Sequence, residues 1–290
     1  MPTYRFKQVD VFTGQPFLGN PVAVVLDADD IDPAQMQRIA AWTNLSETTF
    51  VLKPTGDADY RLRIFAPAVE MPFAGHPTVG SAHAALEAGV VSGLSFRQEC
   101  GAGVLPLTVN GTGTDRRIFV RVPETKVIGT YEASADAISA ALGAPIARRP
   151  APMAIDVGPV WMVAYAEAEE TVRGLEPDMA AVAKLSRDLG VVGVAVFSPR
   201  SGDDSAAVHV RCFAPAAGVP EDPVTGSGNA TIARYLAETG MLKKIGDEYV
   251  ASQGTEMGRD GRVHVRVSDD GRAIEIGGSS VTVIEGQISL

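Results

Sequence analysis

The sequence predicts an α+β fold of two pseudo-symmetric lobes that arise from an internal duplication. Each lobe is expected to be a curved, mostly antiparallel sheet around a central helix. Two observations support this prediction. Four short motifs occur twice in the same order along the chain, and each copy combines valine-rich runs of strand length with a short helix that is apolar on nearly every side.

The repeated motifs indicate a duplication because their partners stay in register. The four pairs are residues 19–22 and 158–160, the helix starts Asp32-Pro33 and Glu176-Pro177, residues 63–67 and 211–215, and residues 72–76 and 223–227. The separation between partners grows slowly and in one direction, as short loop insertions in one copy would cause. One pair alone would be weak support, whereas four in order favour a repeat.

The predicted strands are short apolar runs rich in Val. They cover residues 22–25, 49–52, 119–122, 194–197, 208–212 and 263–267. One helix is expected over residues 33–43, with Asp32 as its N-cap and Pro33 in its first turn, and another over residues 177–189 that ends at Gly190. These elements alternate in the same way in both halves.

Two further helices are expected to form the centres of the lobes. Residues 77–88 end at Gly89 and residues 229–239 end at Gly240, as C-terminal glycines predict. Both segments are apolar nearly all round, which is typical of a buried helix. With turn residues at 110–113, the first lobe is expected to span residues 1–115 and the second 116–278, and the C-terminal strand within 279–290 to return to the first sheet.

Composition narrows the class of protein. The chain has 290 residues, 46 % of them apolar and 21 % charged, which is typical of a soluble globular protein and not of a disordered one. No apolar run is long enough to span a bilayer, and the first residues lack a signal-peptide pattern, so a cytoplasmic protein without a membrane partner is expected. The net charge of −10 makes nucleic acid an unlikely partner but permits a small anionic substrate.

Both central helices are entered through glycine, at Gly75 in the first copy and at Gly226 and Gly228 in the second. Glycine lets backbone N–H groups face outward, and the positive end of a helix dipole attracts a carboxylate. If the lobes pack about a pseudo-two-fold axis, the two helix starts face one cleft that holds a ligand. The alternative is two ordinary helix starts, with Thr225 or Ser227 as an N-cap.

Acidic and polar residues beside these turns are the candidate functional groups. Glu47, between Ser46 and Thr48, aligns with Val192 in the second copy, so the repeat does not conserve an acid there. Glu47 is therefore either a catalytic acid or a solvated loop glutamate. Asp222 either contacts a ligand or stabilises the following helix start, and His76 either binds a polar group or packs at its helix.

The remaining residues give little sign of a metal or cofactor. His83 lies two helical turns after His76, and His209 and His264 alternate with valines and are expected to face outward from their strands. The histidines and the two cysteines show no metal-ligand spacing, and no dinucleotide, phosphate-loop or nucleophile-elbow motif occurs. The sequence therefore favours chemistry without a cofactor or metal.

At these residues the chain resembles the PhzF-like family of phenazine biosynthesis, within the diaminopimelate-epimerase-like fold. The resemblance rests on motifs along nearly the whole chain: Asp10-Val11-Phe12, residues 19–24, Asn44-x-Ser46-Glu47-Thr48-x-Phe50, Pro72-x-x-Gly75-His76-Pro77-Thr78, residues 221–227, Gln253-Gly254, Gly258-Arg259 and Gly277-Gly278. It implies a two-lobed homodimer without metal or cofactor, and an isomerase that moves a proton on a dihydro-hydroxyanthranilate.

The resemblance also implies roles for individual residues. Glu47 matches the family's proton-transferring acid/base, whereas His76, Asp222 and Ser227 match positions that hold and polarise the ligand. Epimerase and racemase relatives carry a cysteine after each paired glycine turn. This chain has His76 and Ser227 there, which argues against racemisation by two thiols.

Three functions therefore remain open from the sequence. The first is an isomerase in which Glu47 moves a proton on a small cyclic or unsaturated carboxylate, aided by helix-start N–H groups near Gly75, Gly226 and Ser227. The second is an amino-acid epimerase with two bases, Glu47 and Asp222. The third is a protein that binds small carboxylates without catalysis.

Overall fold

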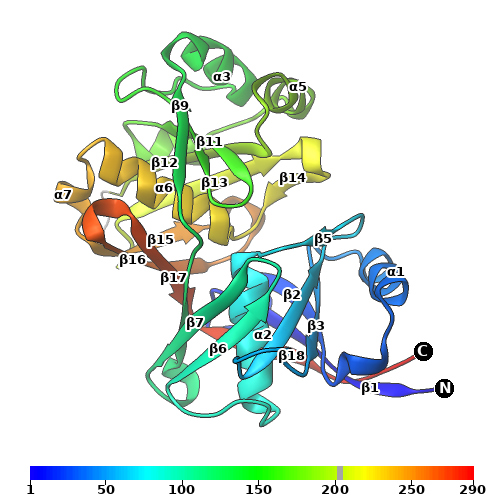
Figure 1. The fold of residues 1–290 in the computed structure, drawn as a ribbon. Coiled ribbons are helices and arrows are strands. Elements are labelled where there is room, and N and C mark those ends of the chain that lie inside the picture. The colour runs from blue at the N-terminus through cyan, green and yellow to red at the C-terminus, as the bar shows by residue number, and fades with distance from the viewer. Residues whose placement is uncertain (201–204) are drawn as a thin grey trace. The chain divides into compact units, whose positions relative to one another are not determined.

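The computed structural model describes residues 1–200 and 205–290, and these form two compact units (Figure 1). The first unit comprises Met1–Arg121 and Gly277–Leu290, and the second comprises Val122–Ile276. The division lies after Arg121, whereas the turn signal predicted a boundary at residue 115. The reason is that the turn at residues 110–113 joins two neighbouring strands of one sheet, so the first unit continues to the end of the second of them.

The first unit is a curved sheet with two long helices. Its elements are β1 (Thr3–Val11), β2 (Asn20–Val25), α1 (Pro33–Thr43), β3 (Thr48–Leu52), β4 (Tyr60–Phe65), β5 (Glu70–Met71), α2 (Gly75–Glu87), β6 (Ser95–Cys100), β7 (Gly103–Asn110), β8 (Arg117–Arg121) and β18 (Ser280–Ser289). Most neighbouring strands are antiparallel, but β2 pairs in parallel with β3 and β4 with β6. The C-terminal strand β18 pairs antiparallel with β1 along its length.

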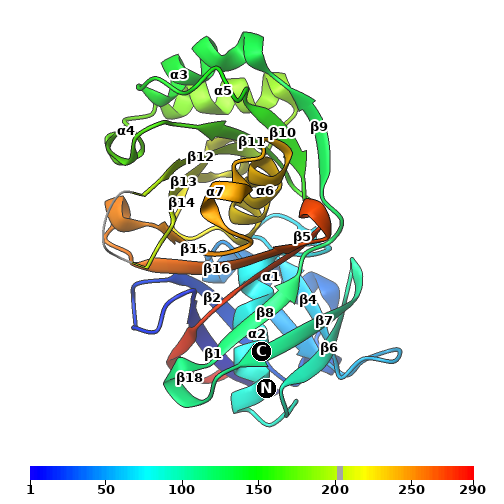
Figure 2. The same cartoon turned by 90° about the vertical axis from the view of Figure 1, so that its left-hand side faces the viewer.

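The second unit contains a sheet of the same kind and more helices. Its elements are β9 (Lys126–Thr130), α3 (Ala135–Leu142), β10 (Met153–Asp156), β11 (Val160–Tyr165), α4 (Glu169–Arg173), α5 (Met179–Leu189), β12 (Gly193–Pro199), β13 (Val208–Ala214), β14 (Val219–Asp222), α6 (Gly226–Glu238), α7 (Leu242–Ile245), β15 (Glu248–Gln253), β16 (Gly261–Ser268) and most of β17 (Ala273–Gly278), whose last two residues belong to the first unit. In Figure 2, α3 and α5 lie on the side of strands β11 and β12 that faces away from α6.

The strand pairings of the first unit recur in the second. The order antiparallel, parallel, antiparallel, antiparallel, parallel, antiparallel holds for β1–β2, β2–β3, β3–β4, β4–β5, β4–β6 and β6–β7. It holds again for β10–β11, β11–β12, β12–β13, β13–β14, β13–β15 and β15–β16. The extra strands β18 and β9 pair antiparallel with β1 and β10, which occupy equivalent places.

The predicted helices exist, with some differences at their ends. Helix α1 begins at Pro33, and the Asp32 side chain accepts from the Gln35 amide, as predicted. Helix α5 begins at Met179 instead of residue 177, because the Asp178 carboxylate accepts from two amides of the first turn. Helices α2 and α6 begin earlier than predicted, at their glycine turns. Helices α3, α4 and α7 were not predicted from the sequence.

Helix α2 forms the centre of the first unit. Every residue from Gly75 to Ala85 is buried, as expected for a helix that is apolar all round. The fit against the sheet is close at Gly80, where a Cβ atom would lie 2.5 Å from Val22 Cγ1 and 2.7 Å from Val11 Cγ2. The middle of α2 therefore packs closely on β1 and β2.

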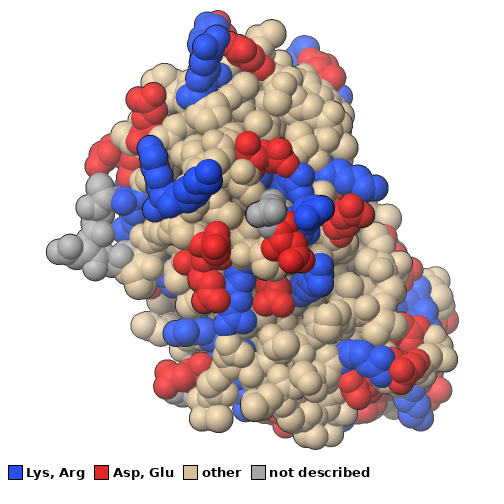
Figure 3. Space-filling model, turned by 60° about the vertical axis from the view of Figure 1, so that its left-hand side comes forward, with Lys and Arg blue, Asp and Glu red and all other residues tan. Residues whose placement is uncertain are grey.

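The surface carries both signs of charge. On the face shown in Figure 3, Lys and Arg side chains are interspersed with Asp and Glu. The chain termini lie together in the first unit, where the Leu290 amide donates to the Pro2 carbonyl at 3.0 Å. Among the described residues, no helix is long and apolar enough to cross a membrane.

Candidate active site

Glu47 and His76 meet in the first unit. The Glu47 Oε2 atom lies 3.3 Å from His76 Nε2, and the two side chains are 14 % and 6 % exposed. Glu47 follows the left-handed residue Asn44 at the end of α1 and directly precedes β3, whereas His76 is in the first turn of α2. The Glu47 side chain is thus largely shielded from solvent.

The start of α2 offers polar groups next to this pair. The N-cap residue Ala74 has no side chain to accept from the first turn, and the first N–H groups of any helix lack an acceptor within the helix. The Thr78 amide reaches the Ala74 carbonyl, at 3.2 Å. The alternative of an ordinary side-chain-capped start therefore does not hold for α2, and the helix start can stabilise negative charge.

His76 is neutral in this environment. Burial lowers the pKa of His76 from 6.5 to about 3, although a backbone acceptor at Pro21 favours the charged form. On its other side, His76 Nδ1 lies 3.5 Å from Asn20 Nδ2, and Asn20 is completely buried on β2. A neutral imidazole has one N–H donor and one acceptor nitrogen.

The equivalent helix start in the second unit holds Ser227. The indole Nε1 of Trp161, on β11, donates to Ser227 Oγ at 3.0 Å, and Trp161 is buried. Thr225 is the N-cap of α6 but forms no side-chain capping bond, so neither residue acts as the predicted cap. Because Ser227 Oγ accepts from the indole, its own hydrogen is available to another acceptor.

Gly228 is required by packing behind this turn. A Cβ atom at Gly228 would lie 2.6 Å from the Cys212 sulfur. Burial raises the pKa of the Cys212 thiol, so this cysteine is held as a neutral group in the core. Cys212 therefore packs against the glycine turn and is not an activated nucleophile.

Asp222 is the last residue of β14, and its main chain is held by Gln253 at the end of β15. The Gln253 Nε2 atom donates to the Asp222 carbonyl at 2.9 Å and to Thr225 Oγ1 at 3.0 Å. Its Oε1 atom accepts from the Thr225 amide and from Asn229 Nδ2, both at 3.0 Å. Gln253 stands in one of the sequence motifs without a predicted role, and no role was predicted for Trp161 or Asn20.

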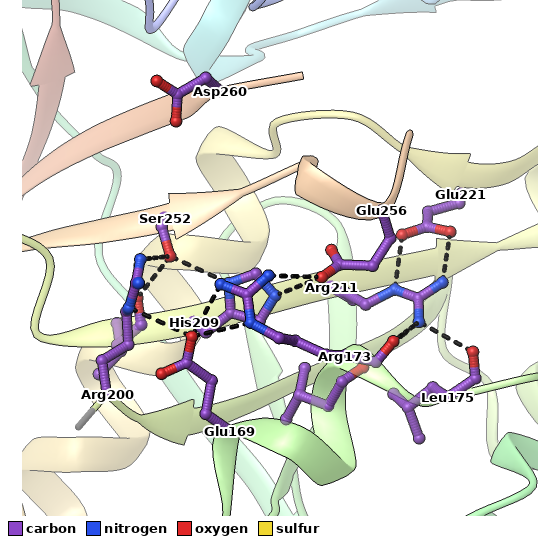
Figure 4. A network of polar contacts seen from close by, with 12 residues as sticks. Glu169, Arg173, Leu175, Arg200, His209, Arg211, Glu221, Ser252, Glu256 and Asp260 are labelled. Atoms are coloured by element: carbon purple, nitrogen blue, oxygen red, sulfur yellow. Dashed lines mark hydrogen bonds and ion pairs between the residues drawn. The ribbon is translucent and has the colours of Figure 1, made fainter. Parts of the chain in front are cut away.

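The neighbouring acid Glu221 has a structural partner. Its two carboxylate oxygens accept from Arg211 Nε and Nη2 at 2.8 and 2.9 Å, and both side chains are largely buried. Arg211 Nη1 also donates to the Leu175 carbonyl at 2.9 Å (Figure 4). Glu70 binds Arg63 in the same two-pronged way in the first unit. Glu221 therefore belongs to the fold, and Asp222 remains the candidate acid.

His209 does not face outward, contrary to the prediction. It is completely buried, with Nδ1 2.9 Å from Ser252 Oγ and Nε2 3.1 Å from Glu256 Oε1. Figure 4 shows these side chains in a larger network with Arg173. Alternation with valine identifies two faces of a strand, but here residues of α4 and of the segment after β15 cover the second face.

The predicted site residues thus form two sets, one in each unit. Glu47, Gly75 and His76 come together in the first, with Ser46 adjacent to Glu47 in sequence and half-buried. Gly226, Ser227 and Gly228 open α6 in the second, shortly after Asp222. Among the described side chains, no group of three or more His, Cys, Asp or Glu residues has the arrangement of a metal site.

Comparison with known proteins identifies the family. The profile of the family described as "Phenazine biosynthesis-like protein" matches residues 9–286. "Antisense-enhancing sequence 1" of Schizosaccharomyces pombe is 40 % identical, covering 99 % of both chains. "Trans-2,3-dihydro-3-hydroxyanthranilate isomerase" of Pseudomonas aeruginosa is 34 % identical, covering 99 % of this chain and 100 % of that protein.

A solved structure supports the same assignment. The crystal structure of a PhzF-family phenazine biosynthesis protein from Bacillus anthracis superposes with a TM-score of 0.85 at 28 % identity, over 100 % of both chains. The fold is thus similar to that of PhzF proteins, and several relatives carry isomerase in their names. The chain belongs to the phenazine biosynthesis-like family and is an isomerase of the PhzF-like type.

Proposed function

We propose that the protein is a cofactor-independent isomerase that moves a proton on a small cyclic or unsaturated carboxylate, with Glu47 as the acid/base. The observation that carries the proposal is the contact between the Glu47 carboxylate and the neutral His76 at the uncapped start of α2. The second unit has Val192 in place of Glu47, so the repeat does not require an acid there for folding.

In the proposed reaction, the ionised Glu47 removes a proton from a carbon next to a π-system or carboxylate. The electron pair of that C–H bond moves into the conjugated system, and Glu47 becomes a carboxylic acid. Glu47 then returns its proton to another carbon, which regenerates the carboxylate and leaves the substrate isomerised. Negative charge on the intermediate is stabilised by N–H groups at the helix start beside Gly75.

His76 suits this role because it is neutral. A protonated imidazole 3.3 Å from Glu47 would form an ion pair and make the carboxylate a weaker base. A neutral ring positions Glu47, or a polar atom of the ligand, without adding a charge. We assign His76 to holding and polarising the ligand next to Glu47.

The second unit supplies the other ligand contacts in this proposal. Ser227 donates its hydroxyl hydrogen to the ligand, because its oxygen already accepts from Trp161. Gly226 and Gly228 leave the start of α6 open to a carboxylate, and Asp222 binds or polarises the ligand.

The strand pairings that recur in the two units are explained by a duplication. We infer that the two units derive from one duplicated unit. The strongest support is the ion pair Arg63–Glu70, which recurs as Arg211–Glu221 with the arginine stacked on the phenylalanine two residues later. The proposal also includes a homodimer, which the family resemblance implies, and a cytoplasmic location, which the sequence composition favours.

The test uses trans-2,3-dihydro-3-hydroxyanthranilate, the substrate in the name of the Pseudomonas aeruginosa relative. Because a positioned acid/base contributes about 10²–10⁴-fold, Glu47→Gln is expected to lower kcat at least about 100-fold. Asp222→Asn is expected to lower activity less, through ligand binding. Glu248→Gln, on a side chain that is 77 % exposed, is the matched control and is expected to keep full activity.

Other outcomes separate the alternatives. Comparable losses in Glu47→Gln and Asp222→Asn, with inversion of a stereocentre in an amino-acid substrate, would support a two-base epimerase. Tight binding of the probe without product, unaffected by Glu47→Gln, would support a carboxylate-binding protein. Near-normal turnover by Glu47→Gln would refute the proposed role of Glu47.

A further inference from the structure

The Gln253 amide forms four hydrogen bonds of 2.9 to 3.0 Å to the segment that carries Asp222 and begins α6. Its two hydrogens go to the Asp222 carbonyl and Thr225 Oγ1, and its oxygen accepts from the Thr225 amide and Asn229 Nδ2. The amide orientation is fixed, because one partner is a backbone carbonyl and another a backbone N–H. Gln253 is 1 % exposed.

The backbone beside Gln253 approaches the same segment. Gly254 adopts a left-handed conformation with φ 93°, and a Cβ atom there would lie 2.6 Å from the Pro223 carbonyl oxygen. The Gln253 side chain and the Gly254 backbone therefore hold residues 222–225 at two separate points.

The first unit keeps one of these restraints and lacks the other. Gly101 contacts Pro72 as Gly254 contacts Pro223, with a Cβ atom of Gly101 2.8 Å from Pro72 Cα. Tyr60 of β4 opposes Gln98 of β6, as Val208 of β13 opposes Ala251 of β15. Two residues further along these strands, Gln253 therefore corresponds to Cys100. A thiol cannot replace the four hydrogen bonds of an amide.

The same comparison places Met71 at the position of Asp222, because Glu70 and Glu221 make the equivalent arginine pairs. The unit that carries an acid before its glycine turn thus also carries the amide that binds the main chain of this acid. The first unit lacks both, with Met71 at the position of the acid and Cys100 at the position of the amide. This joint difference connects Gln253 with Asp222 and not with the fold that both units share.

We propose that Gln253 is a positioning residue, which holds Asp222 and the start of α6 in the relative geometry needed for ligand binding and catalysis. This inference rests on the proposed function for the role of Asp222. Gln253 itself acts through the main chain of Asp222 and the N-cap residue Thr225, and it does not react.

The first test is local and independent of any substrate. In the full chain, Gln253→Met removes the hydrogen bonds and keeps most of the side-chain volume. Hydrogen exchange followed by mass spectrometry is expected to show at least about tenfold faster exchange in peptides covering residues 222–229, with unchanged protection in β16. Unchanged exchange over residues 222–229 would overturn the proposal, whatever the protein's activity.

The second test measures kcat and KM with trans-2,3-dihydro-3-hydroxyanthranilate. Gln253→Met is expected to lower kcat/KM at least about tenfold, since small misplacements of reacting groups are costly. Cys100→Ser, at the equivalent position of the first unit, is the matched control and is expected to retain wild-type values. Values for Gln253→Met within twofold of the wild type would contradict the proposal.

Two further measurements separate positioning from a general loss of structure. In Gln253→Glu, the loss of kcat/KM relative to the wild type is expected to become smaller as pH falls. The reason is that a protonated, neutral carboxyl group at residue 253 again donates to the Asp222 carbonyl. In a double-mutant cycle, Gln253→Met combined with Asp222→Asn is expected to lose little more than the worse single variant. A pH-independent deficit or fully additive losses would contradict action through Asp222.

Failure of the proposed function gives a different result. If the wild type leaves the probe unchanged while Gln253→Met accelerates exchange over residues 222–229, the substrate assignment fails and the restraint by Gln253 stands. If the wild type is active and Gln253→Met affects neither exchange nor turnover, the positioning role fails and the proposed function stands.

Discussion

The protonation state of His76 provides a sharp test of the site in the first unit. Burial lowers its pKa from 6.5 to about 3, so the ring is expected to stay neutral throughout the physiological range. A neutral His76 adds no positive charge beside the Glu47 carboxylate at their 3.3 Å contact, which suits the proposed base. A charged His76 would instead form an ion pair.

The size of the effect follows from the two pKa values. The unfolded chain protonates His76 near 6.5, whereas the folded chain does so only near 3, so the unfolded state binds more protons between these limits. The stabilisation from a neutral His76 is therefore complete above pH 6.5 and is lost as pH falls toward 3. Between pH 7 and pH 5 this amounts to about 2 kcal/mol of unfolding free energy.

Nuclear magnetic resonance of the histidine rings measures the pKa directly. The chain has four histidines, and the variant His76→Gln identifies the signal of His76 by its loss. We expect this signal not to shift between pH 8 and pH 5. In urea unfolding, the wild type is expected to lose about 2 kcal/mol more than His76→Gln over pH 7 to 5. A titration with a midpoint near 6 would refute the reasoning.

Three further predictions concern the rest of the fold. Glu221→Gln is expected to lower the free energy of unfolding in urea by about 3 kcal/mol, because it leaves a buried arginine without a counter-charge. Glu70→Gln, at the more exposed equivalent pair, is expected to lower it by less than about 1 kcal/mol. Equal losses in the two variants would contradict this. Hydrogen bonding by His83, and also by Lys7 and Thr282, holds the pKa of Glu87 well below its ordinary value of 4.5 despite partial burial. The ionised Glu87 therefore stabilises the folded state above pH 4.5, and this stabilisation is lost as pH falls below that value. Glu87→Gln should therefore speed hydrogen exchange in β18 at pH 7, with a smaller difference from the wild type below pH 4, and equal exchange at pH 7 would count against this. Because burial raises the pKa of Cys212, the native protein should resist alkylation there at pH 8 while the denatured chain reacts, and rapid native alkylation would contradict the packing role.

Local features of the fold were predictable because their causes are local. Asp32 caps α1 where a polar residue precedes Pro33, and the all-apolar composition of α2 and α6 indicated their burial. Helix α5 shows the limit of such signals. Both Pro177 and Asp178 are favourable at a helix start, and only the structure shows that the Asp178 carboxylate is the cap.

Features that depend on distant segments were not predictable in the same way. Alternation in β13 indicates that His209 lies on the opposite face from its valines, but it does not show that residues of α4 and of the segment after β15 cover this face. The Glu47–His76 contact is similar. Each residue can be recognised from its own sequence motif. The contact between them depends on tertiary structure, in which β3 pairs in parallel with β2.

Gln253 shows which sequence signal was missed. Gln253-Gly254 ends one strand as Cys100-Gly101 ends the equivalent one, so aligning the repeats at these glycines would have identified a polar residue present in only one copy. Glu47 is likewise a polar residue present in only one copy of the repeat. The four hydrogen bonds of the Gln253 amide explain why the difference matters.

The most direct test of the role of Glu47 follows solvent deuterium during a reaction with trans-2,3-dihydro-3-hydroxyanthranilate in D₂O. One carboxylate that both removes and returns the proton predicts a product in which deuterium enters at a single carbon and is partly diluted by protons carried over from the substrate. It also predicts that Glu47→Gln abolishes this exchange while still binding the probe. Deuterium incorporation by Glu47→Gln at the wild-type rate would contradict the assignment of Glu47 as the acid/base.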